Sequence, residues 1–241
     1  MRNALLLARR EIGSFLRSPI GYVVGAVALL IEGLYFYVFG LHTGPQLSAQ
    51  VLAFFFEGVS GTTMVLSALL AMRLIAGERE SGTLVLLNTA PIREVEVVLG
   101  KFLAGLAYLT ILLALTIYMP LLIFVNGKVS VGHIVVGYVG VLLLASASLA
   151  ISLFASSLAN NQVVAVIVAG AMLGTLFLLF FVARAADPPI NSFLSGLAIF
   201  HTRQRTFMIG VLKLENVLYN VAGAYLFLLA TTKTLEARRW R

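Results

Sequence analysis

The chain has 241 residues, of which 60% are hydrophobic and 11% are charged, and its mean hydropathy is +1.00. Soluble domains carry about 25% charged residues, so this composition excludes an ordinary soluble domain and indicates an integral membrane protein. The formal charge of +7 points to anionic lipid headgroups and not to nucleic acid, because no soluble face is predicted to carry a basic patch.

Apolar segments recur along the whole chain and predict an all-α membrane protein with one transmembrane domain over residues 1–241. A helix of about 20 apolar residues crosses the roughly 30 Å hydrocarbon core. We expect six spans, at residues 20–41, 51–75, 97–125, 131–155, 162–183 and 214–232. The sixth is the least distinct, since Asn216 and Asn220 lie near its start.

Residues 1–18 precede the first span and mix leucines with Arg9, Arg10, Glu11 and Arg17. This pattern suits a helix that lies in the headgroup layer. Pro19 should end that helix, because the residue before a proline is disfavoured in helical geometry. The alternative is a basic flank that only orients the first span.

Two acidic residues lie inside predicted spans, Glu32 in the first span and Glu57 in the second. Ionisable residues inside a membrane are functional-site hypotheses by default. These two would line an outward-facing cavity or bind a proton or a cationic cargo. The alternative is that they snorkel towards the headgroups or bond to neighbours such as Ser60 and Thr62.

The connector between the second and third spans, residues 78–93, is polar and charge-dense. Its Glu-Arg-Glu sequence at 78–80 should leave the hydrocarbon, where each charge costs about 2.5 to 3.5 kcal/mol. Ser81 or Thr83 would then cap a short helix that carries exposed leucines. A groove on another protein would bury such leucines; the alternative is that they dip into lipid.

Residues 190–213 follow the fifth span and mix apolar side chains with Arg203, Arg205 and Lys213. They are too polar to span the membrane and too apolar for a free loop. We expect short external helices that dip into the outer leaflet, and a plain structured loop is the alternative.

Basic residues are distributed unevenly about the six predicted spans. Twelve of the 17 fall on the side of the termini, and the remaining five fall on the opposite side. Basic residues near span ends favour the cytoplasm, so we expect both termini to be cytoplasmic.

The sequence offers no catalytic or metal-binding motif. A phosphate-binding loop needs Gly-Lys followed by Ser or Thr, whereas Gly100-Lys101 and Gly127-Lys128 are followed by Phe and Val. Any ATPase must therefore be a separate polypeptide. Cysteine is absent, and His42, His133 and His201 are scattered, so no metal site is expected.

Three stretches carry a resemblance to a known family. Residues 73–101 run from a charged cluster through Ser81-Gly82-Thr83 and Pro91 to Gly100-Lys101, and this order resembles the ABC-2-type transporter permeases. Residues 160–165 and 234–240 look like the subgroup that includes the gliding-motility-associated permease GldF and NosY-like permeases.

The resemblance implies a set of parts and partners. Residues 1–18 would be an elbow helix, residues 190–213 external re-entrant helices, and residues 78–93 a coupling helix that seats on a cytoplasmic ABC ATPase subunit, which binds ATP and Mg²⁺. A second permease copy or a related permease would complete the complex in the cytoplasmic (inner) membrane of a prokaryote, with an envelope or auxiliary subunit as a further partner. The expected ATPase contacts are Glu78, Arg79, Glu80, Ser81, Gly82, Thr83, Leu84 and Leu87.

The sequence therefore predicts a non-enzymatic permease subunit that couples ATP hydrolysis by a partner to substrate translocation. One alternative is a mechanotransmission subunit that acts on an envelope partner without moving cargo through itself. Another, from a different class, is an ATP-independent channel or proton-linked carrier that uses Glu32 and Glu57.

Overall fold

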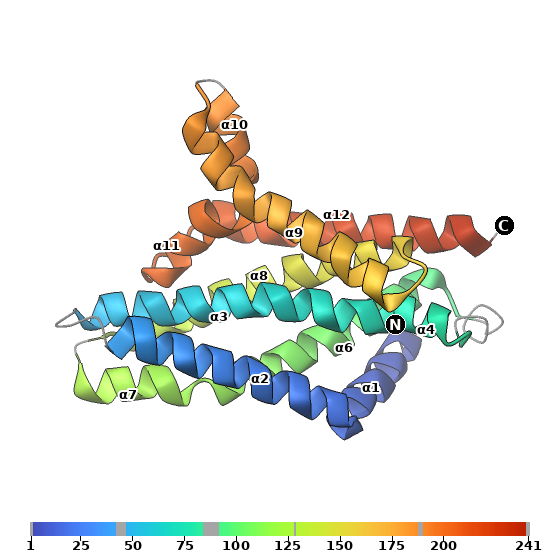
Figure 1. The fold of residues 1–241 in the computed structure, drawn as a ribbon, viewed down its shortest axis with the longest axis horizontal. Coiled ribbons are helices and arrows are strands. Elements are labelled where there is room, and N and C mark those ends of the chain that lie inside the picture. Colours follow the sequence, from blue (N-terminus) through green and yellow to red (C-terminus); the bar gives the residue numbers. More distant parts are fainter. Residues whose placement is uncertain (1, 42–46, 84–91, 128, 188–189, 240–241) are drawn as a thin grey trace.

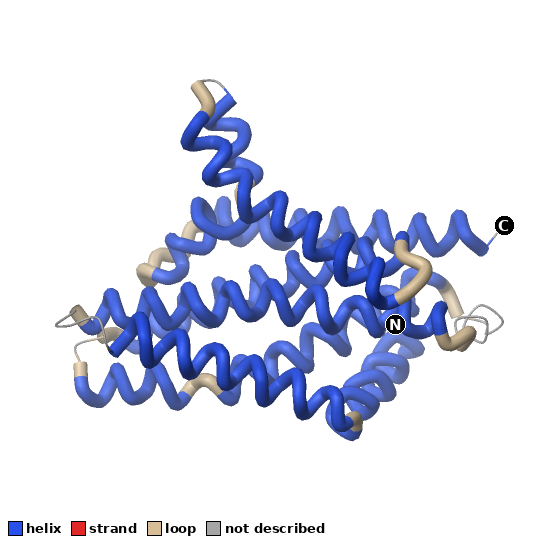
Figure 2. The backbone as a smooth tube through the Cα atoms, in the orientation of Figure 1, coloured by secondary structure: helices blue, strands red, loops and turns tan. Residues whose placement is uncertain are grey.

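The computed structural model describes residues 2–41, 47–83, 92–127, 129–187 and 190–239. Within these ranges every regular element is a helix and none is a strand (Figure 2). The predicted all-α fold is confirmed for this part of the chain.

The first half begins with α1 (Arg2–Arg17), which turns sharply at Ser18 into α2 (Pro19–Tyr35). Ser18 is extended, with φ −83° and ψ 131°, as expected for a residue that precedes proline. A π-helical segment, η1 (Phe36–Leu41), continues α2. Helix α3 (Ser48–Ala71) is likewise continued by the π-helical η2 (Met72–Ala76) and by α4 (Gly77–Glu80).

The second half contains α6 (Glu94–Leu115), α7 (Tyr118–Asn126), α8 (Val131–Leu158) and α9 (Gln162–Ala185). Short elements follow, namely α10 (Ile190–Leu197), η3 (Ile199–Gln204) and α11 (Arg205–Met208), before α12 (Leu214–Arg239). Helix α12 packs along α8, while α9 diverges from the bundle and carries α10 away from it (Figure 1). Both termini lie at the end of the bundle where α4 lies.

Five helical stretches among the described residues are long and apolar enough to cross a membrane. They are Pro19–Gly40, Ser48–Glu80, Glu94–Val125, Val131–Leu158 and Gln162–Ala185. The predicted sixth span corresponds to α12, which is long enough but falls outside this group. Its polar residues at both ends, including Asn216, Asn220 and Lys233, lower its hydropathy.

Two predicted spans differ in detail from the observed helices. The second was expected to end at residue 75, but its helix continues to Glu80. The third was expected to be one helix over 97–125, but it breaks between Leu115 and Tyr118. Pro120 explains the break, since it has no N–H to donate to the carbonyl of Thr116 and its ring crowds that carbonyl.

The core lies where α3 and α8 face each other. One apolar cluster, with the fully buried Phe56 and Leu144, fills the end of the bundle away from the termini. A second cluster, with Leu74 and Leu149, fills the end near α4. Helix α9 is mostly exposed, so its surface is left to lipid or to another chain.

Candidate functional site

The helical stretch that runs through α3, η2 and α4 ends after α4 for a local reason. Gly82 has a φ of +73°, a left-handed conformation that favours glycine and stops a helix. Just before α4, the last residue of the π-helical η2 is bonded to α8: the Ala76 N–H donates to Ser156 Oγ at 3.0 Å. A hydrogen bond to α8 therefore fixes the start of α4, and the left-handed Gly82 ends the helix.

Glu78 points inward from α4 to a buried lysine. Its Oε2 atom lies 2.7 Å from Nζ of Lys101 on α6, whose side chain is 0% exposed. The contact is an ion pair in which the ammonium group is not aligned for a hydrogen bond. A buried charge that loses its partner costs about 3 to 5 kcal/mol, so this pair strongly favours one position of α4 relative to α6.

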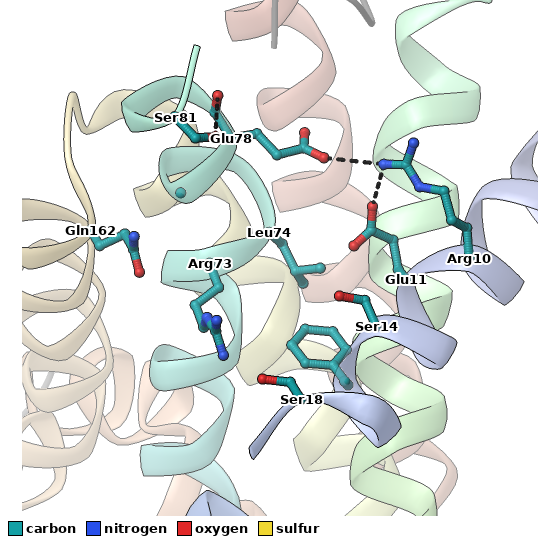
Figure 3. Close-up of a pocket in the computed structure, with 11 residues that line it drawn as sticks. Arg10, Glu11, Ser14, Ser18, Arg73, Leu74, Glu78, Ser81 and Gln162 are labelled. Atoms are coloured by element: carbon teal, nitrogen blue, oxygen red, sulfur yellow. Dashed lines mark hydrogen bonds and ion pairs between the residues drawn. The ribbon is translucent and has the colours of Figure 1, made fainter. Parts of the chain in front are cut away.

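Two residues of α1 complete a cluster of four charges. Arg10 contacts Glu11 at 2.9 Å and Glu78 at 3.5 Å, as the dashed lines in Figure 3 show. Glu11 also lies 3.7 Å from Nζ of Lys101. We call Arg10, Glu11, Glu78 and Lys101 the charge cluster; it is neutral overall and joins α1, α4 and α6.

Arg79, the next residue of α4, reaches the opposite way and holds the C-terminal end of α8. It donates to the carbonyl oxygens of Ser157, at 3.2 Å, and Ala159. Arg238 of α12 donates to the neighbouring Leu158 carbonyl at 2.8 Å. The last carbonyls of a helix lack partners within it and carry partial negative charge, so two arginines from other elements stabilise this helix end.

Glu80 contacts the beginning of α9. Its Oε2 atom accepts a hydrogen bond from the backbone N–H of Gln162 at 3.2 Å, and Asn161 caps the same helix by accepting from the N–H of Val164 at 2.8 Å. A carboxylate is favourable at a helix N-terminus because the free N–H groups carry partial positive charge. Three consecutive side chains therefore tie α4 to α1, α6, α8 and α9.

The residues after α4 close the C-terminal end of that helix. The Ser81 and Thr83 hydroxyls both donate to the carbonyl of Glu78, each at 3.3 Å. The following helix that they were expected to cap lies outside the described residues, so that expectation stays a prediction. Residues 81–83 are exposed. The predicted contact residues Leu84 and Leu87 lie outside the described residues.

A polar cavity of about 300 Å³ borders the charge cluster between α1 and the end of the α3 helix (Figure 3). Arg10, Glu11, Ser14, Arg73 and Glu78 are among its lining residues. Water in such a cavity would solvate the exposed edge of the cluster, while Lys101 stays fully buried.

The two intramembrane acids occupy different environments. Glu32 is 6% exposed and lies on the face of α2 that also buries Gly21, Gly25 and Ala28, so it does not snorkel. Glu57 is half-buried and borders two cavities, neither of which Glu32 lines. No described residue forms an ion pair with either acid.

The neighbours proposed as partners of Glu57 are used elsewhere. Ser60 accepts a hydrogen bond from Gln204 at 3.1 Å, and Thr62 donates to the carbonyl of Gly58 at 3.0 Å. The structure therefore does not bring Glu32 and Glu57 into one site, which a carrier using both would require.

Sequence reasoning missed three members of the charge cluster, namely Lys101 and the two α1 residues Arg10 and Glu11. Lys101 was counted only as one of the twelve basic residues on the side of the termini, near the start of the third predicted span. Yet it lies two turns inside the helix that begins at Glu94, and a lysine followed by a long apolar run is an intramembrane ionisable residue. That pattern could have identified it.

The family comparison agrees with this architecture. The sequence model described as ABC-2 family transporter protein matches residues 5–232, which include every element from α1 to most of α12. Comparison with curated proteins returns no match. Because the match covers nearly the whole chain, the protein belongs to the ABC-2 family of transporter proteins, as a membrane component.

Proposed function

We propose that this chain is the permease subunit of an ABC transporter, and that a separate ATPase subunit drives it by pressing on the segment that begins at α4. The observation that carries the proposal is the set of bonds made by Glu78, Arg79 and Glu80. A displacement of α4 reaches four other helices through three adjacent side chains.

The proposed mechanism is a rigid movement of packed helices. The charge cluster keeps α1, α4 and α6 together, since separating α4 from α6 would remove the 2.7 Å partner of the buried Lys101 and leave it only the longer, 3.7 Å contact with Glu11. Arg79 and Glu80 pass the same displacement to the end of α8 and the start of α9. Helices α8 and α9 meet at these ends, so the movement would change the angle between them.

The membrane arrangement follows from the same geometry. We assign α12 as a sixth span, because it runs the length of the bundle beside α8 (Figure 1). Both termini and α4 would then face the cytoplasm. Helix α1 would lie in the headgroup layer, with its exposed Leu5 and Leu6 in lipid. Residues 190–208 would form the external short helices.

The complex would contain two permease subunits, either two copies of this chain or this chain with a related permease. ATP and Mg²⁺ would be bound by the ATPase subunits. The family is generally associated with an ABC ATPase and a dimeric arrangement, and this association supports the proposal.

A second candidate is mechanotransmission to an envelope partner without passage of cargo. It is favoured by α10, which projects away from the bundle and exposes Ile190 and Phe193. Exposed apolar side chains on a projecting element fit a protein contact. The separate environments of Glu32 and Glu57 make the ATP-independent carrier the least favoured function.

The test uses the predicted contact leucines. We expect Leu84→Asp with Leu87→Asp to abolish co-purification of a stoichiometric ATPase subunit, while Leu212→Asp with Leu214→Asp, at the opposite end of the bundle, leaves it unchanged. Both variants should insert and elute as the native chain does. A full complement of ATPase with the first variant would refute the proposed contact.

A further inference from the structure

A large cavity opens at the end of the bundle away from both termini, between the start of α3, the end of α9 and α11. Its volume is about 870 Å³, within the range of small-molecule pockets. Aromatic side chains, including Phe54, Phe180 and Phe200, form much of its wall, and Arg184 and Arg205 supply positive charge. We call it the outer cavity.

The two arginines are not neutralised by the part of the chain that the structure describes. Arg184 lies 5.0 Å from the centre of the Phe180 ring, and neither guanidinium forms an ion pair with a described residue. Glu57 is the one acid in the lining. Guanidinium groups bind phosphate through paired hydrogen bonds, so the outer cavity is suited to a phosphate-bearing group.

A second cavity of about 520 Å³ continues from the first, between α2 and α3. The two share Glu57 and Phe200 as lining residues. Beyond Glu57 its walls are almost wholly apolar and include Val27, Ile31 and Val65. We call it the apolar groove.

The length of the apolar groove matches one leaflet of a bilayer. Its lining on α3 runs from Glu57 to Leu69, and twelve residues of helix rise by about 18 Å. Half of a hydrocarbon core is about 15 Å. An alkyl chain that starts at Glu57 and ends at Leu69 would therefore reach from the headgroup region to the bilayer midplane.

We propose that the outer cavity and the apolar groove together bind one phospholipid-like amphiphile. Its phosphate contacts Arg184 and Arg205, and an alkyl chain fills the groove between α2 and α3. Glu57 lies where head and chain meet and accepts a hydrogen bond from a hydroxyl group of the head. The assignment concerns binding alone and does not depend on transport or on an ATPase.

Glycines provide a matched pair of variants for the groove. A Cβ atom at Gly61, which lines the groove, would meet nothing within 4 Å, so Gly61→Leu introduces a side chain into the groove without a clash at its Cβ atom. Gly170 on α9 is equally open and does not line the groove, so Gly170→Leu is the control. Val65→Trp, at another lining position, provides an independent second block.

Basic residues provide the matched pair for the head. Arg184→Gln with Arg205→Gln removes both proposed phosphate contacts. Lys213→Gln removes an exposed positive charge at the same end of the bundle, outside the lining of the outer cavity. All variants are used as the full chain and are first checked for native elution.

The probe is a phosphatidylglycerol with a photoreactive diazirine in one acyl chain, added to protein in a maltoside detergent that contains no phosphate. Diacylglycerol with the same chains is the headless comparison. We expect crosslinks on α2 and α3, lost in Gly61→Leu and Val65→Trp. The double arginine variant should lower phosphatidylglycerol labelling about tenfold, since charge-assisted hydrogen bonds are strong. Labelling by diacylglycerol should be low in the native chain and equally low in the double arginine variant.

Three outcomes would overturn the proposal. Equal labelling of the native chain and both groove variants would indicate an adventitious lipid only. Equal labelling by phosphatidylglycerol and diacylglycerol would show that the arginines do not bind phosphate. Displacement of the probe by glycerol 3-phosphate alone would identify a free phosphate compound, and not a lipid, as the ligand.

Discussion

Replacing Lys101 by methionine tests whether the charge cluster holds α1, α4 and α6 together. The substitution keeps the side-chain length and removes the charge, so it leaves Glu78 without its 2.7 Å partner. Breaking a buried ion pair costs about 3 to 5 kcal/mol. The Glu78 side chain keeps Arg10 at 3.5 Å, is 14% exposed and borders the polar cavity, where water would help to solvate its carboxylate. We therefore expect the lower value, about 3 kcal/mol.

The chain offers a control with the same chemistry at its surface. Lys233 lies 2.7 Å from Glu236, but its side chain is 74% exposed, and exposed pairs contribute about 0 to 1 kcal/mol. In thermal unfolding followed in detergent, about 3 kcal/mol corresponds to a fall of about 6 to 12 °C for a chain of this size. Lys233→Met should lower the midpoint by at most about 4 °C. Equal shifts in the two variants would refute the argument that burial gives the charge cluster its strength.

Three further predictions concern the docking of α1 on α6, the contact of Arg79 with the end of α8, and Glu57. Gly100→Ala should destabilise the chain by about 1 to 3 kcal/mol, because its Cβ would lie 2.9 Å from a backbone oxygen of α1. Gly13→Ala is the control, because a Cβ atom there meets nothing, and it should stabilise the chain by up to about 1 kcal/mol. Thermal unfolding measures both variants, and an equal loss of stability in the two would contradict the close docking of α1. Arg79→Gln should speed amide hydrogen exchange at the end of α8 more than Arg238→Gln does, since Arg79 is partly buried and contacts two carbonyls; equal rates would show that the α4 contact is dispensable. Glu57→Gln should change the free energy of unfolding by less than about 0.5 kcal/mol, and a large loss of stability would reveal a partner that the described contacts do not contain.

The sequence predicted the spans well wherever apolar length decides the structure. The five helices that qualify as spans each overlap a predicted segment. The break in the third could also have been predicted, because Pro120 removes one helical hydrogen bond in the middle of the apolar run. The sixth span is ambiguous for a physical reason, since α12 carries polar residues that pack inside the protein. Asn216, for example, donates to Thr206 at 2.7 Å.

The end of the second span was misjudged because a run of charged residues can continue a helix when the fold pairs the charges. The sequence showed Glu78, Arg79 and Glu80 as solvated charges on a connector. Their partners, Lys101, the end of α8 and the start of α9, are 23 to 82 residues away in the chain. No local pattern encodes such pairing, so the bonds within the candidate site could not be predicted. Its location could be, because the charged connector is visible in the sequence.

These bonds also change which residues are available to a partner. A partner that contacted the Glu78 carboxylate directly would have to take it from Lys101 and leave that buried cation with Glu11, 3.7 Å away, in place of its 2.7 Å partner, at a cost of up to about 3 to 5 kcal/mol. An ATPase contact is more favourable on residues 81–83, which are exposed, and on the segment that follows them. Charge reversal at Glu78 or Glu80 would disrupt the bundle whether or not an ATPase binds there. Substitutions after residue 83 are therefore the ones that separate a docking surface from the contacts that hold α4 in place.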